Sequence, residues 1–76
     1  MEAEAMKMLA VGLTAGLGLM GPALGIGIIG YSALQGIARN TEASGPIMTN
    51  MILVTAFCEA VAIYALIIAI ILAMVV

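Results

Sequence analysis

Two long apolar runs, separated by one short polar segment, constrain the fold of this chain more than any other feature. The first run covers about residues 6–38 and the second about 47–76, with the polar segment at 39–46. At a rise of about 1.5 Å per residue, either run forms a helix longer than the roughly 30 Å hydrocarbon core of a bilayer. The sequence therefore predicts an all-α membrane protein in which residues 1–76 form one domain, a hairpin of two transmembrane helices.

The polar segment is the predicted loop of this hairpin. It reads Arg39-Asn40-Thr41-Glu42-Ala43-Ser44-Gly45-Pro46, and its Gly-Pro pair is expected to break the helix. A cleaved signal peptide is a weaker interpretation of the N-terminal run. Glu2 and Glu4 replace the positive charges that such a signal needs, and the run is too long.

Composition supports the membrane class and excludes several others. Hydrophobic residues make up 66% of the chain, charged residues only 8%, and the mean hydropathy is +1.34, whereas about a quarter of an average soluble domain is charged. The net charge of −2 leaves no basic patch for nucleic acid. The single cysteine, Cys58, cannot form an internal disulfide. We expect no cofactor and no metal site, and a chain of 76 residues can build a larger assembly only by oligomerisation.

The glycines of the first run fall on two faces of the predicted helix. Each costs about 1 kcal/mol relative to alanine in a helix interior, so close packing must compensate. Counting about 100° per residue places one group within about 60° of arc and the other on the far side. The first group is Gly12, Gly16, Ala23, Gly27 and Gly30, and the second is Gly18, Gly21, Gly25 and Gly36.

These small faces indicate close helix contacts, with two possible arrangements. Small residues spaced by four, as in Gly12-x-x-x-Gly16 and Gly21-x-x-x-Gly25, let transmembrane helices approach closely. Two opposed faces favour a helix packed between identical neighbours, and such a heterologous contact repeated by rotation closes into a ring. Alternatively, one face packs on the second helix of the same hairpin and the other on any nearby helix. Pro22 can bend the helix and shift this count.

Glu59 is the only charged residue of the second run. A charged side chain at the centre of a membrane helix is costly, and such residues commonly serve ion or proton movement. Thr55, Ala62 and Ile63 lie on the same predicted face, at i−4, i+3 and i+4. This apolar surround favours the neutral acid, so release of the proton needs a positive charge from a partner or an aqueous path. Two alternatives are a structural carboxyl bonded to Tyr64 or Thr55 of a neighbour, and a residue that lines a pore.

The motifs together resemble those of the c-subunit, the rotor-ring proteolipid, of the F-type ATP synthase, over essentially the whole chain. They are the glycine-rich segment from Gly16 to Gly27, the segment Gly36-Ile37-Ala38-Arg39-Asn40 that leads into a polar loop, and Glu59 followed by Ile63-Tyr64. The resemblance implies a closed homo-oligomeric ring of identical copies, with the first helix inside and the second outside. It also implies that Glu59 is the ion-carrying carboxylate and that the chain is no enzyme by itself.

The resemblance further implies the partners and the location. The loop residues Arg39, Asn40, Thr41 and Glu42 would face the cytoplasm and contact the gamma and epsilon subunits of the central stalk. An arginine of the stator a-subunit would lie opposite Glu59. Membrane lipid would surround the ring, and the membrane most compatible with the resemblance is the bacterial inner membrane. Thr41 stands where the family usually has proline, which predicts a less rigid loop.

Three departures from the family pattern bear on the carried ion. Sodium-binding members resemble one another in three oxygen-bearing side chains, at positions where this chain has Ile26, Ala60 and Val61. A hard cation needs several oxygen ligands, so the sequence predicts proton transport. A sodium-coupled ring and a structural or pore-forming proteolipid remain the alternatives. The predicted surround of the proton site is Ile26, Thr55, Ala60, Ala62, Ile63 and Tyr64.

Overall fold

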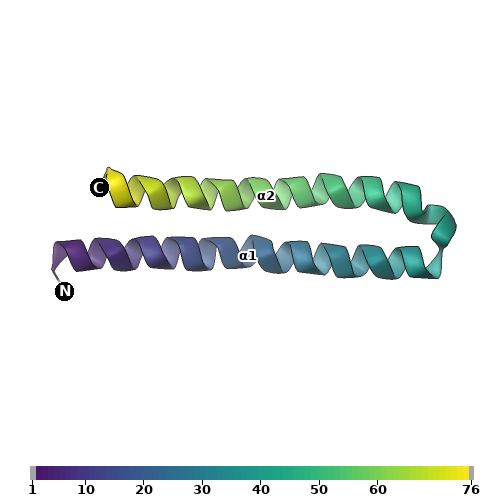
Figure 1. The fold of residues 1–76 in the computed structure, drawn as a ribbon, viewed down its shortest axis with the longest axis horizontal. Coiled ribbons are helices and arrows are strands. Elements are labelled where there is room, and N and C mark those ends of the chain that lie inside the picture. Colours follow the sequence, from purple (N-terminus) through teal and green to yellow (C-terminus); the bar gives the residue numbers. More distant parts are fainter. Residues whose placement is uncertain (1, 76) are drawn as a thin grey trace.

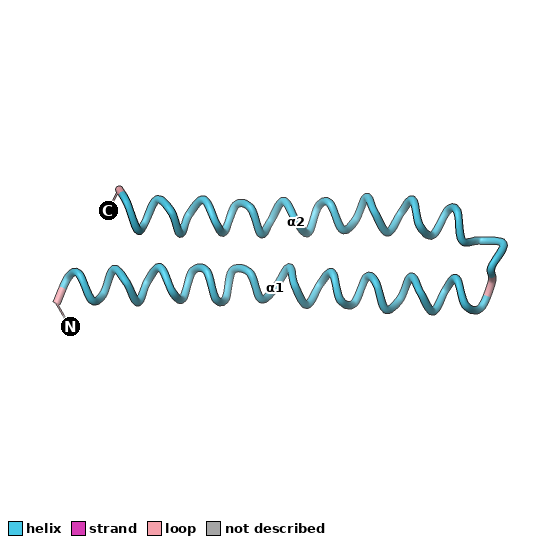
Figure 2. Tube along the Cα trace, viewed as in Figure 1, coloured by secondary structure: helices cyan, strands magenta, loops and turns pink. Residues whose placement is uncertain are grey.

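The chain folds into two long antiparallel helices joined by a tight turn (Figure 1). The computed structural model describes residues 2–75: helix α1 is Ala3–Arg39, the short 3₁₀ helix η1 is Thr41–Ala43, and α2 is Ser44–Met74. The molecule measures 58 × 18 × 7 Å, and Figure 2 shows nearly all of its length as helix. The predicted all-α helical hairpin is confirmed.

Helix α1 begins three residues before its predicted start near residue 6 and ends at Arg39. Glu4 lies in its first turn and Arg39 in its last, which are the ends where negative and positive charge are favourable for the helix dipole. Ala3 and Ala5 are strong helix formers. The helix continues through Pro22, which removes one backbone hydrogen bond without ending the helix.

The turn is held by the backbone and side chain of Asn40. This residue is extended, with φ −148° and ψ 92°, and its side-chain oxygen accepts a 3.2 Å hydrogen bond from the backbone N–H of Glu42. The backbone N–H of Ala43 donates to the carbonyl of Asn40 at 3.0 Å. An asparagine side chain that binds its own backbone two residues on is a common turn former, so the reversal needs no positive-φ glycine.

The predicted loop bounds of 39–46 are too wide. Helix α2 already begins at Ser44, and Gly45 and Pro46 lie in its first turn. The N–H groups of a first turn have no partner within the helix, so a proline costs nothing there and its fixed φ suits the helix. The Gly-Pro pair therefore starts a helix here. The second helix was expected to reach residue 76, which lies outside the described residues; α2 ends at Met74.

Small side chains make the contact between the two helices. A Cβ added to Gly18 would lie 2.8 Å from Ala65 Cβ, one on Gly25 would lie 3.5 Å from Cys58 Sγ, and one on Gly36 would lie 3.1 Å from Ile47 Cδ1. The only hydrophobic side chains buried within residues 2–75 are Ala33 and Ala69, at 9% and 5% exposure. The backbones are thus close together, and the large apolar side chains point outward.

These pairs define one constant antiparallel register. From Gly18 to Gly25 the chain advances seven residues while the partner falls back seven, from Ala65 to Cys58. Seven residues are about two helical turns, so the same faces meet again. Both helices have the length and apolar composition needed to cross a membrane. Their outward-facing apolar surface is suited to lipid or to other membrane helices.

Candidate functional site

Glu59 is the central residue of α2, which runs from Ser44 to Met74. The fifteen residues on either side span about 22 Å each at the rise of an α-helix. Because Cys58 lies against Gly25, the antiparallel register places Glu59 opposite Leu24, in the middle of α1. The carboxylate is thus as far from both ends of the hairpin as this fold allows.

Within one hairpin the Glu59 side chain is exposed and has no hydrogen-bond partner. The side-chain hydrogen bonds within residues 2–75 join Gln35 to Tyr31, Asn40 to Glu42, Thr49 to Gly45, and Asn50 to Pro46. A carboxyl group in an apolar membrane needs such partners. Within residues 2–75, no side chain of the same hairpin supplies Glu59 with such a partner.

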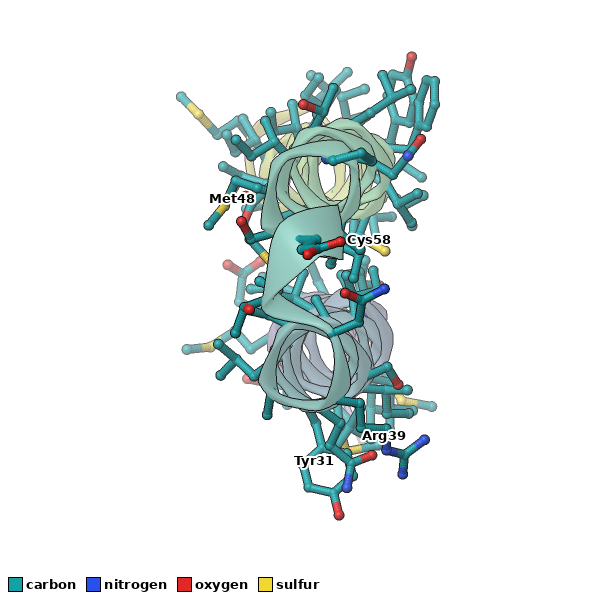
Figure 3. The ribbon with its side chains drawn as sticks, turned by 90° about the vertical axis from the view of Figure 1, so that its right-hand side faces the viewer. Tyr31, Arg39, Met48 and Cys58 are labelled. Carbon is teal, nitrogen blue, oxygen red and sulfur yellow. The ribbon has the colours of Figure 1, made fainter. Side chains whose placement is uncertain are left out.

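The direction of Glu59 follows from two labelled side chains of α2. Viewed from the turn, Met48 projects from one side of the hairpin and Cys58 lies between the helices (Figure 3). Glu59 follows Met48 by eleven residues, which is about three turns and within about 20° of the same direction. We call this side of the hairpin the Met48 flank. Glu59 projects from the Met48 flank, roughly at right angles to the line between the helices.

Four glycines of α1 that do not contact α2 also lie on the Met48 flank. Arg39 projects from the opposite side in Figure 3, which we call the Arg39 flank. By the helical count, four glycines lie about 120° to 180° around α1 from Arg39. A Cβ added to any of these four would meet nothing within 4 Å: they are Gly12, Gly16, Gly27 and Gly30. The Met48 flank thus combines a stripe of small residues on α1 with the carboxylate on α2.

The second predicted glycine face is divided by the structure. Gly18, Gly25 and Gly36 face α2 of the same chain, as the alternative arrangement predicted for one face. Gly21 does not join them, because a Cβ there would meet nothing within 4 Å. It precedes Arg39 by eighteen residues, about five full turns, so it lies on the Arg39 flank. Gly21 lies about 40° to 60° around α1 from the other three, which is enough to separate a lateral position from a facing one.

Some residues of the predicted surround of Glu59 lie on its side of the hairpin, and others do not. Thr55 and Ala62 are half-buried on its side of α2, and Ile63 is exposed about 40° away. Half-buried Ile26 lies about 140° around α1 from Arg39 and, by the register, close to the level of Glu59. These side chains are near neighbours within one hairpin.

Ala60 and Tyr64 are directed elsewhere. They are rotated from Glu59 by about 100° and 140° around the axis of α2. Tyr64 is 65% exposed. Neither side chain therefore lies beside the carboxylate of Glu59 in its own chain. If both belong to the surround of Glu59, as predicted, they approach the Glu59 of a second copy.

The loop residues form a separate region. Arg39, Asn40, Thr41 and Glu42 are all exposed, and they lie at the turn about 22 Å or more along the axis from Glu59. The structure thus brings the four loop residues together but keeps them apart from the carboxylate.

Sequence reasoning missed the partners of the facing glycines. Cys58 and Ala65 pack against Gly25 and Gly18, which sets the spacing of the helices at the level of Glu59. The seven-residue spacing of Cys58 and Ala65 matches that of Gly18 and Gly25 and was a usable signal. It is weak by itself, because alanine recurs through most of α2.

Comparison with known proteins gives a consistent result. Residues 9–72 match the family model of the ATP synthase C-subunit. The chain is 58% identical over 72 residues, 95% of both chains, to the ATP synthase c-subunit of Dehalococcoides mccartyi. It is 46% identical over 66 residues, 87% of both chains, to that of Chloroflexus aurantiacus. With that of Prochlorococcus marinus it shares 44% identity over 69 residues, covering 91% of this chain and 85% of the relative.

Proposed function

The chain belongs to the ATP synthase c-subunit family, and we propose that identical copies form a closed rotor ring in which Glu59 carries protons through the membrane. As a member of this family it is an integral membrane component of the ATP synthase complex and no complete enzyme by itself. In the proposed cycle Glu59 takes up a proton from one access path, travels with the ring while neutral, and releases the proton into another. The rotation would drive ATP synthesis elsewhere in the complex.

The central position and exposure of Glu59 carry this proposal. It is the only ionisable carboxyl group of α2, it lies at the helix midpoint, and its side chain is exposed. A purely structural carboxyl is expected to have a fixed partner, and no side chain of the same hairpin forms a hydrogen bond with Glu59 within residues 2–75.

The two flanks of the hairpin support a ring. A heterologous contact would place the Met48 flank of one copy against the Arg39 flank of the next, and rotation would close it. The open stripe of Gly12, Gly16, Gly27 and Gly30 allows close approach of α1 helices in this contact. Tyr64 of the adjacent copy projects from that copy's Arg39 flank and away from its α1, so its hydroxyl is a candidate partner for the protonated Glu59.

The side chains near Glu59 support protons over sodium ions. Sodium is a hard cation that needs several oxygen ligands. On the Glu59 side of this hairpin the hydroxyl of Thr55 is the one side-chain oxygen besides the carboxylate, and Ile26, Ala62 and Ile63 have none. Ala60 and Val61 add none from the next turn. A proton needs only one acceptor, which Glu59 supplies.

The remaining partners follow from the family and from charge. Release of the proton needs a positive charge or an aqueous path at the level of Glu59, and Lys7 and Arg39 of this chain lie near the ends of α1. An arginine of the stator a-subunit would supply it. The exposed turn, Arg39 to Glu42, would face the cytoplasm and contact the gamma and epsilon subunits of the stalk. This turn is suited to a protein contact because it is polar and ordered by Asn40.

A hydrophobic carbodiimide tests the role of Glu59, since it reacts with the protonated acid. We expect the purified oligomer to be labelled at Glu59 alone, at a rate that does not change with excess sodium. The reason is that Glu59 lies at the centre of the apolar helix α2, where a hydrophobic reagent partitions, whereas the other carboxyl groups lie near the ends of the hairpin. The measurement is the rate of mass increase of the intact chain between about pH 5 and pH 9, a range above the ordinary carboxyl value of about 4.3.

The loop carboxyl of Glu42 is the matched internal control for this measurement. It is exposed at the turn and should remain unlabelled throughout. Protection by sodium would replace the proton with sodium as the carried ion. A labelling rate that declines as an ordinary solvated carboxyl does would mean that Glu59 lies in water, which supports the pore or structural alternative.

A further inference from the structure

An apolar groove of about 480 Å³ lies between the two helices near the turn. Its floor is formed by residues of both helices whose side chains are buried or half-buried: Ile29, Ala33, Ile47 and Met51. Its rim is formed by exposed residues: Ile28, Ser32, Pro46, Asn50 and Val54. None of these residues belongs to the predicted surround of Glu59 or to the glycines of the Met48 flank. The groove is therefore a separate feature of the hairpin.

The groove opens on the Arg39 flank. Ile28 and Ser32 precede Arg39 by eleven and seven residues, which places both within about 20° of its direction around α1. Asn50 follows Met48 by two residues, or about 200°, so it lies on the other side of α2 from Met48. Figure 3 shows Met48 and Arg39 projecting from opposite sides of the hairpin. Met48 and the groove are thus on opposite flanks.

Met48 lies at the height of this groove. The residues of α2 that line the groove run from Pro46 to Val54, and Met48 is within this range. Its side chain is 44% exposed and projects outward (Figure 3). Methionine is unbranched and flexible, and it fills irregular apolar gaps well. Each hairpin therefore has a long apolar side chain on one flank and an apolar groove at the same height on the other.

We propose that the groove binds the side chain of Met48 from the adjacent copy. This inference rests on the proposed ring, in which the Met48 flank of one copy meets the Arg39 flank of the next. Rotation about an axis along the membrane normal keeps every residue at its own height. Met48 of one copy therefore arrives at the groove of the next. Because this contact is heterologous, every groove of a closed ring is filled.

Ile52 is the other large side chain of the Met48 flank at this height, and its direction is less suitable. Cys58 packs against Gly25 and so marks the side of α2 that faces α1. Met48 is rotated from Cys58 by about 80°, and Ile52 by about 120°. Met48 thus points directly toward a neighbouring copy, whereas Ile52 points partly away from both helices. Ile52 is also β-branched and therefore stiffer.

The polar groups at the rim are compatible with a thioether. The side-chain nitrogen of Asn50 donates to the carbonyl of Pro46 at 2.9 Å. The hydroxyl of Ser32 takes part in none of the side-chain hydrogen bonds within residues 2–75. The sulfur of methionine is a weak hydrogen-bond acceptor. Met48 can therefore accept a hydrogen bond from Ser32, which an aliphatic side chain cannot do.

Cross-linking between two introduced cysteines tests this contact. All variants carry Cys58→Ala, which removes the native thiol. Met48→Cys and Asn50→Cys are combined, and the purified oligomer is treated with a bifunctional methanethiosulfonate reagent no longer than a methionine side chain. The two positions lie on opposite sides of α2, so this reagent joins them only between copies. We expect a ladder of covalent products that extends beyond the dimer in dodecyl sulfate gels, because each copy uses both flanks.

The matched control combines Met48→Cys with Thr49→Cys. Thr49 is exposed, does not line the groove, and is rotated by about 100° from Asn50, so this pair should give no ladder. Products that stop at the dimer would overturn the proposal, because two Met48 flanks would then meet. An equal ladder from the control pair would also overturn it.

Native mass spectrometry and carbodiimide labelling separate this proposal from the proposed ring. If the Met48→Cys, Asn50→Cys oligomer keeps its mass and is labelled at Glu59 but gives no ladder, the contact of Met48 with the groove is wrong and the proposed function stands. If only single chains are found, both proposals fail.

Shortening Met48 tests how much its contact stabilises the oligomer. We expect Met48→Ala to give at least about tenfold more dissociated chain than the parent at the same dodecyl sulfate concentration, because large-to-small changes in packed sites are costly. Met48→Leu approximately conserves volume and should resemble the parent. Leu53→Ala is the matched control, since Leu53 is 54% exposed and lies outside the groove. Equal dissociation of Met48→Ala and Leu53→Ala would contradict the proposal.

Discussion

Replacing Glu59 with glutamine is expected to abolish proton-driven ATP synthesis while the ring still assembles. The amide has nearly the same shape but can neither take up nor release a proton. Loss of the proposed proton carrier should reduce the rate to below about 1% of the parent, since positioned acid-base groups contribute about a hundredfold or more. The measurement is ATP synthesis, and ATP-driven acidification, in vesicles that contain the reconstituted complex.

Two further variants serve as comparisons for Glu59→Gln. Glu42→Gln removes the exposed carboxyl of the turn and should leave passive proton conduction unchanged, although it can alter coupling to the stalk. Glu59→Asp keeps a carboxyl group one methylene shorter and should retain a reduced but measurable rate. A Glu59→Gln complex that still synthesises ATP at more than about a tenth of the parent rate would exclude Glu59 as the obligatory carrier. Loss of an obligatory carrier should reduce the rate by much more than about tenfold.

Replacing Gly18 with alanine is expected to destabilise the hairpin, whereas the same change at Gly25 is not. A Cβ at Gly18 would lie 2.8 Å from Ala65 Cβ, and one at Gly25 would lie 3.5 Å from Cys58 Sγ, an ordinary contact. Ala65 Cβ is attached directly to the backbone, so whole helices must move apart at Gly18. Overpacking of this kind costs about 1–3 kcal/mol, against about 1 kcal/mol gained in helix propensity. At Gly25 only the propensity gain remains.

Gly18→Ala and Gly25→Ala serve as controls for each other, because both positions lie on the face of α1 that contacts α2 and both substitutions add one methyl group. We expect loss of helical circular dichroism on titration with dodecyl sulfate to occur at lower denaturant for Gly18→Ala than for the parent, and at equal or higher denaturant for Gly25→Ala. The double variant Gly18→Ala, Ala65→Gly transfers the methyl group across the interface and should recover part of the loss. Equal stability of Gly18→Ala and Gly25→Ala would show that the helices are not as close as the structure has them.

At the turn, the rule that glycine and proline break helices led to a wrong prediction, because the start of α2 was placed too late in the sequence. Gly45 and Pro46 break a helix in its interior, so the sequence predicted a loop through residue 46. In the structure both residues are in the first turn of α2, where proline is favourable. The rule was correct, but the start of the helix is decided by the hydrogen bonds of Asn40 and the short η1 helix, which composition does not indicate.

The glycines of α1 show more clearly which features the sequence predicts and which require the structure. The helical period correctly separated Gly18, Gly25 and Gly36 from Gly12, Gly16, Gly27 and Gly30. It could not say which group faces α2, because a period gives the relative angles on one helix and leaves the rotation of that helix about its own axis open. That rotation is decided by the contacts with Cys58, Ala65 and Ile47 on the other helix.

The sequence by itself determined the two membrane helices, the hairpin, the lone carboxylate and the family, because each depends on local composition, length or motif. The tertiary structure decided that Glu59 lies opposite Leu24 and projects from the same flank as the open glycines, and that Tyr31 points away from α2. These directions depend on how two specific surfaces fit together. Close packing of small residues selects one rotation and one register among many that the sequence pattern allows equally.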